Sequence, residues 1–319
     1  MNMKASLKSL GMNSVVFGLF VVLPMLNMSL RSSLSVAMAL ALCAMGMFLL
    51  LRAGQVSFGH ALYFACGAYT AAALSRVTQW DVLWIMVASA VSSALLGAVL
   101  GLILARYRGI FYGMLNLAFS MVGFSLLFKL YELTGGSDGL GVRQVSLLGM
   151  SLEARDFAWW FYGLSLVMVC GAYRLCVQYL NSPVGAALRA IKTNETRLEY
   201  MGLSAYRVFY SGHVVSAMLC GLGGFIVAFS TGHVTPELSY WALSAEFVFI
   251  AVLGGMGHLR GAVLGALVFE LMRAAVSAYA VNAWQLMMGL LLLGMVMFAP
   301  GGIWSLLEKK QRTVKGEQA

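Results

Sequence analysis

Charged side chains are scarce in this chain: of its 319 residues, 10% are Asp, Glu, Lys or Arg, while 61% are hydrophobic. A soluble domain of this size carries about 25% charged residues. The mean hydropathy of +0.85 points the same way. These values exclude an ordinary water-soluble domain and make the lipid bilayer the expected solvent.

The chain also has few cysteines and no set of side chains with the spacing of a metal site or a catalytic site. The five cysteines all lie inside or at the edge of apolar runs, with neither a disulfide framework nor zinc-type spacing. They are Cys43, Cys66, Cys170, Cys176 and Cys220. No His and acidic residues have the spacing of a metal site, and no order of Ser, His and Asp indicates a catalytic set. We therefore expect packing cysteines, no metal, no catalytic residues and no enzyme activity.

A phosphate-binding loop is missing as well. A Walker A motif needs Gly-Lys before Ser or Thr, because backbone amides and the lysine surround the phosphates. No lysine follows a glycine in this chain. We therefore expect no cofactor in the chain itself. If nucleotide drives the protein, ATP and its Mg are bound by partner subunits.

The net charge of +9 does not indicate nucleic-acid binding, because the basic residues sit at the ends of apolar runs rather than on one surface with interleaved aromatics. The charge pattern instead indicates orientation in a membrane. With a cytosolic amino terminus, fifteen Lys and Arg fall on the cytosolic side and six on the other side or in the membrane. The positive-inside rule then places both termini in the cytosol.

Ten apolar runs approach the length of about 20 residues that a helical membrane span needs. They lie near 11–30, 32–51, 56–75, 82–105, 109–128, 157–176, 207–230, 244–258, 261–281 and 284–303. The first run is longer than a signal-peptide core, so we expect it to be retained. The run at 244–258 is short and broken by Gly254-Gly255, so a re-entrant segment or half-helix is an alternative there. We predict an all-α, polytopic transmembrane helix bundle of about eight to ten spans over 1–303 and a cytosolic basic tail at 304–319.

A polar segment at 178–206 interrupts the apolar pattern. Ser182-Pro183 predicts a capped helix start and Gly202 predicts its stop, so one or two short amphipathic helices are expected between them. The charge pattern places this segment on the cytosolic face. A plain connector would not need such helices, and we interpret the segment as a docking surface.

Several polar groups fall at membrane depth, where they need partners or water. They are His60, His213, Glu246, Glu270 and Arg273. Glu270 and Arg273 lie three residues apart on one helical face, which predicts a local ion pair. A structural role and a direct role in a transport path both stay open for these groups.

A short glycine pattern, which we call the glycine echo, occurs twice in the chain. Gly59-His60 followed by Gly67-Ala68 is matched by Gly257-His258 followed by Gly265-Ala266. Glycine-broken segments in corresponding halves of a membrane protein indicate a transport path, although small residues also allow tight helix packing. The candidate path residues are Gln55, Ser57, Gly59, His60, Gly254, Gly255 and Gly257.

The segment Leu133-Thr134-Gly135-Gly136-Ser137-Asp138-Gly139 superficially resembles an ATPase signature loop, but the expected topology puts it on the side away from ATP. Its glycines and Asp138 suit a tight turn. The surrounding loop of about 28 residues is also long enough to meet an extracytoplasmic partner. The candidate residues for that contact are Gly135, Gly136, Ser137 and Asp138.

Five motifs occur in the order of a known family. They are Gly54-Gln55-Val56-Ser57-Phe58-Gly59-His60-Ala61 with Gly67-Ala68-Tyr69, Leu133 to Leu140, Ser182-Pro183-x-Gly185-x-x-Leu188-Arg189-Ala190-Ile191, Gly254-Gly255-x-Gly257 with Gly261 and Gly265-Ala266, and Pro300-Gly301-Gly302-Ile303. Through these motifs the chain resembles the LivM-type permease subunits of bacterial branched-chain amino acid ABC importers. Urea and amide permeases are close relatives of that type.

The resemblance implies a multi-pass permease of the bacterial inner membrane that imports branched-chain or related amino acids by alternating access. The implied partners are ABC ATPase subunits, a second permease subunit, an extracytoplasmic solute-binding protein and membrane lipid. Ser182 to Gly202 resembles the coupling helices that meet the ATPase, with Tyr200 in place of a small residue. The implied coupling residues are Ser182, Pro183, Gly185, Leu188, Arg189, Ala190, Ile191, Glu195, Glu199 and Gly202.

Within this segment we expect Arg189 and Lys192 to face acidic ATPase surface, and Leu188, Ile191 and Leu198 to supply an apolar anchor. Two alternatives for the whole protein stay open. A urea or short-amide ABC permease would share every motif. An ion-coupled secondary transporter would instead work without an ATPase and use Glu246, Glu270 or His213 as its coupling site.

Overall fold

The computed structural model describes most of the chain between residues 30 and 279. The described residues are 18, 20, 30–147, 149–150, 153–255, 257–279, 286–287, 289–290, 293–294, 297 and 301–305. The spans expected at 11–30 and 284–303 lie mostly outside these residues. The basic tail expected at 304–319 lies outside them beyond residue 305.

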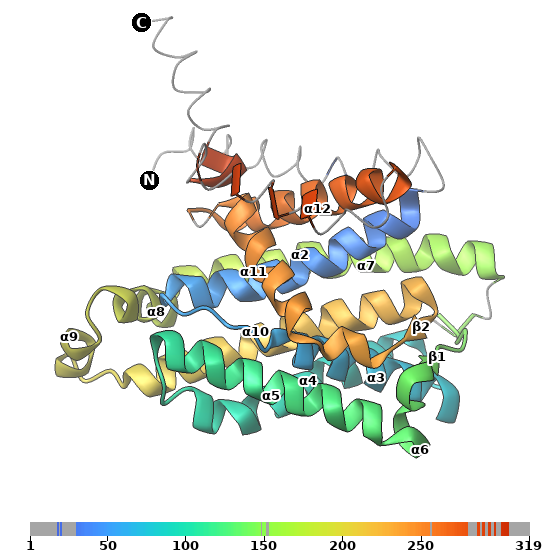
Figure 1. Cartoon of the computed structure of the whole chain (residues 1–319), viewed down its shortest axis with the longest axis horizontal. Helices are drawn as coiled ribbons and strands as arrows, with labels where there is room; N and C mark the ends of the chain where they lie inside the picture. Colours follow the sequence, from blue (N-terminus) through green and yellow to red (C-terminus); the bar gives the residue numbers. More distant parts are fainter. Residues whose placement is uncertain are drawn as a thin grey trace, which may run out of the picture.

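The described chain is built almost entirely of helices that run between two ends of a bundle (Figure 1). The long helices are α2 (Leu30–Arg52), α3 (His60–Val77), α4 (Val82–Leu104), α5 (Gly109–Lys129), α7 (Ala154–Asn181), α10 (Ala205–Thr231), α11 (Trp241–Gly254) and α12 (Leu259–Tyr279). The predicted all-α class is confirmed.

Short elements close the two ends of the bundle. One end carries α8 (Pro183–Thr193) and α9 (Glu195–Tyr200), and the other carries α6 (Tyr131–Thr134), η1 (Gly136–Asp138), β1 (Leu140–Gly141), β2 (His233–Val234) and η2 (Pro236–Ser239). The two strands pair antiparallel, with Leu140 opposite Val234. Figure 1 shows α9 projecting beyond the long helices.

Five of the described helices are long and apolar enough to cross a bilayer, namely α2, α4, α5, α7 and α10. The fourteen residues of α11 reach only about 21 Å at 1.5 Å per residue, less than the roughly 30 Å of a hydrocarbon core. With α12 it forms a pair bent by 117°, which is a broken span or a re-entrant hairpin. The sequence-based doubt about a full crossing at 244–258 is therefore confirmed.

Helix α10 is the centre of the bundle and packs against α2, α3 and α4. Its glycines allow backbone contact: a Cβ at Gly224 would overlap the carbonyl oxygen of Phe64, and one at Gly221 would overlap the side chain of Ser93. Gly67 on α3 meets the backbone of Gly221 in the same way. Since lipid supplies no hydrophobic drive between helices, this close contact is what holds them together.

Gly224→Ala should destabilise the bundle by about 1–3 kcal/mol, because the added methyl group pushes α10 away from α3. Gly163→Ala on α7 is the matched control, since a Cβ added there would have no neighbouring atom within 4 Å. Thermal unfolding in detergent should show a lower midpoint for the first variant only. Equal midpoints would mean that the contact at Gly224 carries no packing energy.

Candidate functional site

The helical pair α8–α9 forms where the sequence predicted it. The Ser182 hydroxyl accepts a hydrogen bond from the backbone N–H of Gly185 at 3.3 Å, which caps α8 at its first turn. Asn194 caps α9 and separates the two helices. Gly202 adopts a φ of +81° just after α9, a left-handed conformation that favours glycine. The predicted start at Ser182 and stop at Gly202 are confirmed.

The apolar side of this pair faces the chain's own bundle. Leu188, Ile191 and Leu198 are 0%, 6% and 4% exposed. Leu188 lies against Gly212 of α10, and a Cβ at Gly185 would overlap the carbonyl oxygen of Tyr179. The expectation that these three side chains anchor a partner is therefore wrong: they fix α8 and α9 to α7 and α10.

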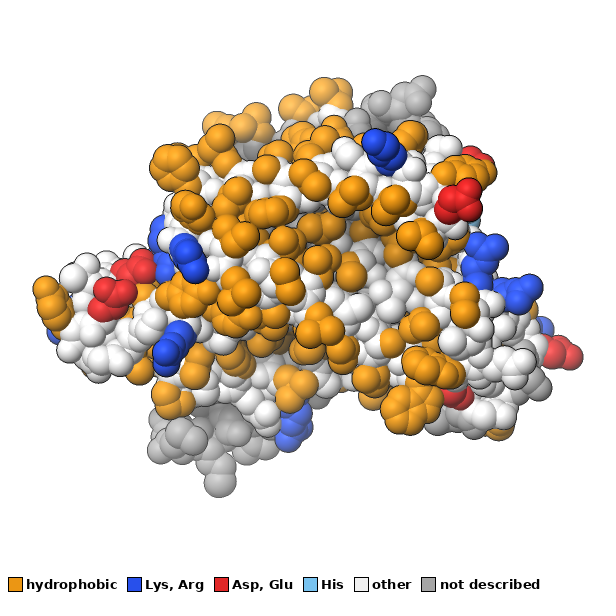
Figure 2. Space-filling view, turned by 90° about the horizontal axis from the view of Figure 1, so that it is seen from below, with side chains coloured by type: hydrophobic (Ala, Val, Ile, Leu, Met, Phe, Trp, Pro, Cys, Tyr) orange, Lys and Arg blue, Asp and Glu red, His pale blue; other side chains and the backbone are white. Residues whose placement is uncertain are grey.

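The outer side of the pair is basic, with an apolar tip. Arg189, Lys192 and Arg197 are exposed, as is Glu199. Tyr200 and Met201 are 88% and 72% exposed at the end of α9. Figure 2 shows hydrophobic side chains over the middle of one face of the molecule and charged side chains gathered mostly toward its two ends. An exposed Tyr-Met tip outside the apolar zone is the kind of anchor that binds a partner.

A two-pronged ion pair ties α9 to the start of α5. Arg108 donates from Nε and Nη2 to the two carboxylate oxygens of Glu195, at 3.1 and 2.9 Å. Its guanidinium also lies 4.7 Å above the ring of Phe209 on α10. Glu195, expected to meet the ATPase, is thus held by its own chain. The role of Arg108 was not predicted from the sequence, because 87 residues separate it from Glu195.

Next to this ion pair lies a buried polar cluster in the bundle. The two ring nitrogens of His213 form hydrogen bonds with Tyr63 and Tyr112, at 3.0 and 2.8 Å. The Nδ1 of His60 bonds the Ser57 hydroxyl at 2.7 Å, and its ring centroid lies 5.5 Å from that of His213. The expectation that the histidines need partners is confirmed in full for His213 and at one nitrogen for His60, whose Nε2 is buried without a hydrogen-bond partner among the described residues. The two tyrosines were missed, because a tyrosine in an apolar run looks like core.

The candidate path residues separate into two turns at the α8 end of the bundle. Gln55, Ser57, Gly59 and His60 belong to the α2–α3 turn, where the Gln55 side chain accepts a hydrogen bond from Gly109 N–H at 2.5 Å. Their neighbours line an apolar cavity of about 450 Å³ against α5.

The second turn, which holds Gly254, Gly255 and Gly257, joins α11 to α12. A Cβ at Gly254 would overlap the backbone of Gly261, and one at Gly265 would crowd Ile250. Both halves of the glycine echo therefore act in helix packing. Gly257 also lines a different cavity of about 290 Å³.

The predicted ion pair in α12 is confirmed. Arg273 Nη2 lies 2.8 Å from a Glu270 carboxylate oxygen, and Arg273 Nη1 lies 3.9 Å from Glu246 of α11. The arginine thus lies between two carboxylates and joins α11 to α12. Among the described residues, no group of three or more His, Cys, Asp or Glu side chains could hold a metal ion.

The glycine loop at the opposite end is a tight turn. Gly135 and Gly136 have φ values of +72° and +54°, and the hydroxyl of Thr134 accepts a hydrogen bond from the N–H of Gly136. The backbone conformation of the turn thus explains why glycines occur at 135 and 136. The side chains of Ser137 and Asp138 are exposed to solvent at its tip.

The apolar helices, with a helical pair at one end and a folded cap at the other, define an integral membrane protein that crosses the bilayer several times. A family model described as the permease component of branched-chain amino acid transport systems matches residues 29–299. The chain belongs to this family, whose members are transport subunits. No solved structure gives a significant match.

Three relatives illustrate the family. The high-affinity branched-chain amino acid permease protein LivM of Escherichia coli K12 is 27% identical over 83% of this chain and 68% of its own length. A probable LivM of Methanocaldococcus jannaschii is 24% identical over 56% of this chain and 55% of its own. The permease protein LivH of E. coli K12 is 28% identical over 38% of this chain and 40% of its own.

A double-mutant cycle should detect the ion pair between α9 and α5. Arg108→Ala and Glu195→Ala should each lower the thermal midpoint, and the double variant should be less destabilised than their sum, with a coupling of about 1 kcal/mol for a partly exposed pair. Arg106→Ala with Glu199→Ala, both exposed, is the control pair and should be additive. Additivity at Arg108 and Glu195 would mean that the bond contributes nothing.

Proposed function

We propose that the chain is a permease subunit of an ABC importer that moves branched-chain or related amino acids into the cytosol. Two observations support this proposal. The chain belongs to the permease family, and a helical pair at one end of the bundle presents an exposed Tyr-Met tip. The chain itself would hold no cofactor. ATP and Mg would be bound by separate ATPase subunits.

Charge supports a cytosolic position for the α8–α9 end. The described residues near this end include many basic groups and two acidic ones. They are Arg52, Arg106, Arg108, Arg174, Arg189, Lys192, Arg197, Arg207 and Arg260, with Glu195 and Glu199. Acidic residues such as Asp81, Glu132 and Asp138 lie toward the opposite end. In a bacterial inner membrane, the positive-inside rule then favours the orientation that places α8 and α9 in the cytosol.

The ATPase would dock on the outer side of α8–α9, through Arg189, Lys192, Tyr200 and Met201. A motion of this pair has two routes into the bundle. The Arg108–Glu195 ion pair leads from α9 to the start of α5. The contact of Leu188 with Gly212 leads from α8 to α10, one residue before His213. Alternating access would result if the ATPase holds the pair differently in its two states.

Further partners follow from the relatives and from the two ends of the fold. Similarity to both LivM-type and LivH-type permeases supports a second, identical or homologous permease subunit beside this one. The cap that contains Gly135, Gly136, Ser137 and Asp138 is a candidate contact for an extracytoplasmic solute-binding protein. The secondary-transporter alternative has less support, because Arg273 already pairs with Glu246 and Glu270.

Uptake measurements in bacterial cells test the function. With the chain and its copurifying subunits expressed, radiolabelled leucine should enter, and ATP depletion should stop its entry. Uptake of urea without leucine would replace the amino acid proposal with the urea or short-amide permease. Uptake that survives ATP depletion but collapses with the ion gradient would support the secondary transporter.

Gly185→Ala should weaken coupling, because the added methyl group overlaps the backbone of α7 and displaces α8. We expect less copurified ATPase, or ATP hydrolysis without matching uptake, in membranes that contain normal amounts of the chain. Gly171→Ala in α7, where an added Cβ would meet nothing within 4 Å, is the control. Wild-type coupling in Gly185→Ala would contradict the proposed role of α8.

A further inference from the structure

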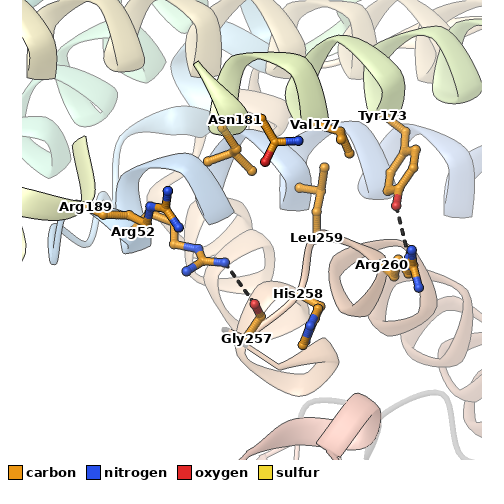
Figure 3. Close-up of a pocket in the computed structure, with 10 residues that line it drawn as sticks. Arg52, Tyr173, Val177, Asn181, Arg189, Gly257, His258, Leu259 and Arg260 are labelled. Carbon is orange, nitrogen blue, oxygen red and sulfur yellow. Dashed lines mark hydrogen bonds between the residues drawn. The ribbon is translucent and has the colours of Figure 1, made fainter. Parts of the chain in front are cut away.

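A cavity of about 290 Å³ opens where α8 meets the ends of α2 and α7 and the start of α12. Figure 3 shows Arg52 and Arg189 side by side on one side of it, with Arg260 on the other. The cavity is lined by Arg52, Tyr173, Val177, Leu180, Asn181, Arg189, Gly257, His258, Leu259 and Arg260. We call it the arginine cavity.

The arginine cavity has an excess of positive charge. Three arginines from three different helices line it, and no carboxylate is among its lining residues. Within the part of the chain that the structure describes, no ion pair joins Arg52, Arg189 or Arg260 to an acidic group. Like charges brought together without a counter-charge repel one another, so the arrangement favours a bound anion.

Two of the arginines are fixed in place by neutral groups. Arg52 donates from Nη2 to the carbonyl oxygen of Gly257 at 2.9 Å, and Arg260 donates from Nε to the Tyr173 hydroxyl at 3.3 Å. These bonds orient both guanidiniums without neutralising them. Arg189 is exposed, and its side chain lies beside that of Arg52 (Figure 3). The amino terminus of α12 also begins in the cavity, at Leu259, and adds positive dipole.

The surroundings of the cavity favour a phosphate-bearing ligand at the membrane surface. Guanidinium groups match phosphate oxygens in two-pronged hydrogen bonds. Val177, Leu180 and Leu259 provide an apolar wall beside the arginines, and Tyr173 has the amphipathic character of residues at the bilayer interface. Basic pockets between transmembrane helices are suited to lipid headgroups.

We propose that the arginine cavity binds a phosphate anion, either the headgroup of an anionic phospholipid or inorganic phosphate. Because Arg189 lies on α8, the bound anion would link α8 to α2 and α12. This inference does not depend on the transported solute or on the direction of transport.

Native mass spectrometry of the full-length chain with its copurifying subunits tests the lipid source. Dioleoyl phosphatidylglycerol is titrated against dioleoyl phosphatidylcholine. Arg189→Gln and Arg52→Gln should each weaken phosphatidylglycerol binding about fivefold, because each removes one charged hydrogen-bond donor to the phosphate. Binding of phosphatidylcholine should not change. Arg106→Gln, an exposed arginine near the same end but outside the cavity, is the control. Arg189→Lys keeps the charge but loses the two-pronged hydrogen bond, so its binding should fall between that of the wild type and that of Arg189→Gln.

A second arm tests inorganic phosphate. Sodium phosphate is compared with sodium chloride at equal ionic strength, and thermal unfolding is measured. Stabilisation by phosphate that is lost in Arg189→Gln, with unchanged lipid binding, would identify free phosphate as the ligand. Unchanged responses of Arg189→Gln and Arg52→Gln in both arms would overturn the proposal. Normal lipid and phosphate responses with loss of a copurifying subunit in Arg52→Gln, a residue outside the proposed ATPase surface, would overturn it too. That result would identify a carboxylate of a partner protein as the ligand of the cavity.

Discussion

Close backbone contact around α10 is the constraint on which the rest of the structure depends. In lipid, two apolar helices gain little from mere contact, so their association relies on packing and polar bonds. The glycines at Gly67, Gly221 and Gly224 bring α3, α4 and α10 within backbone reach. This proximity allows His213 of α10 to bond both Tyr63 of α3 and Tyr112 of α5. The small residues thus position the polar cluster.

The helical pair α8–α9 is joined to this core by side chains of two kinds. Buried leucines hold it against α7 and α10, whereas Arg108 and Glu195 join it to α5 through charge. Apolar contacts tolerate small shifts, but a two-pronged ion pair fixes direction. The ion pair therefore joins α9 to α5 at one defined point. The Phe209 ring lies against the Arg108 guanidinium and meets the Tyr112 ring edge to face, so that point adjoins the buried histidines.

Local signals in the sequence predicted the helices well, and long-range contacts explain what they missed. Ser182 and Gly202 act through their own turns, so the bounds of α8 and α9 could be found from the sequence. Glu270 and Arg273 share one helix face and were predicted as a pair. The partner of Glu195 and the inward direction of Leu188 depend on tertiary packing, which spacing along one helix cannot reveal. Amphipathicity showed that α8 has an apolar side without showing what covers it.

The same limit applies to the glycine echo, whose two halves indicate a candidate transport path when only the sequence is considered. Each half precedes or begins a helix, and each packs that helix on a neighbour: α3 on α10 through Gly67, and α12 on α11 through Gly265. Arg52, at the end of α2, bonds to Gly257, so the turn between α11 and α12 is fixed to the same end of the bundle as α8. A rearrangement of α8 would therefore act on both turns at once. The structure therefore explains the glycine pattern by the close packing of helices, which requires no contact of these glycines with solute.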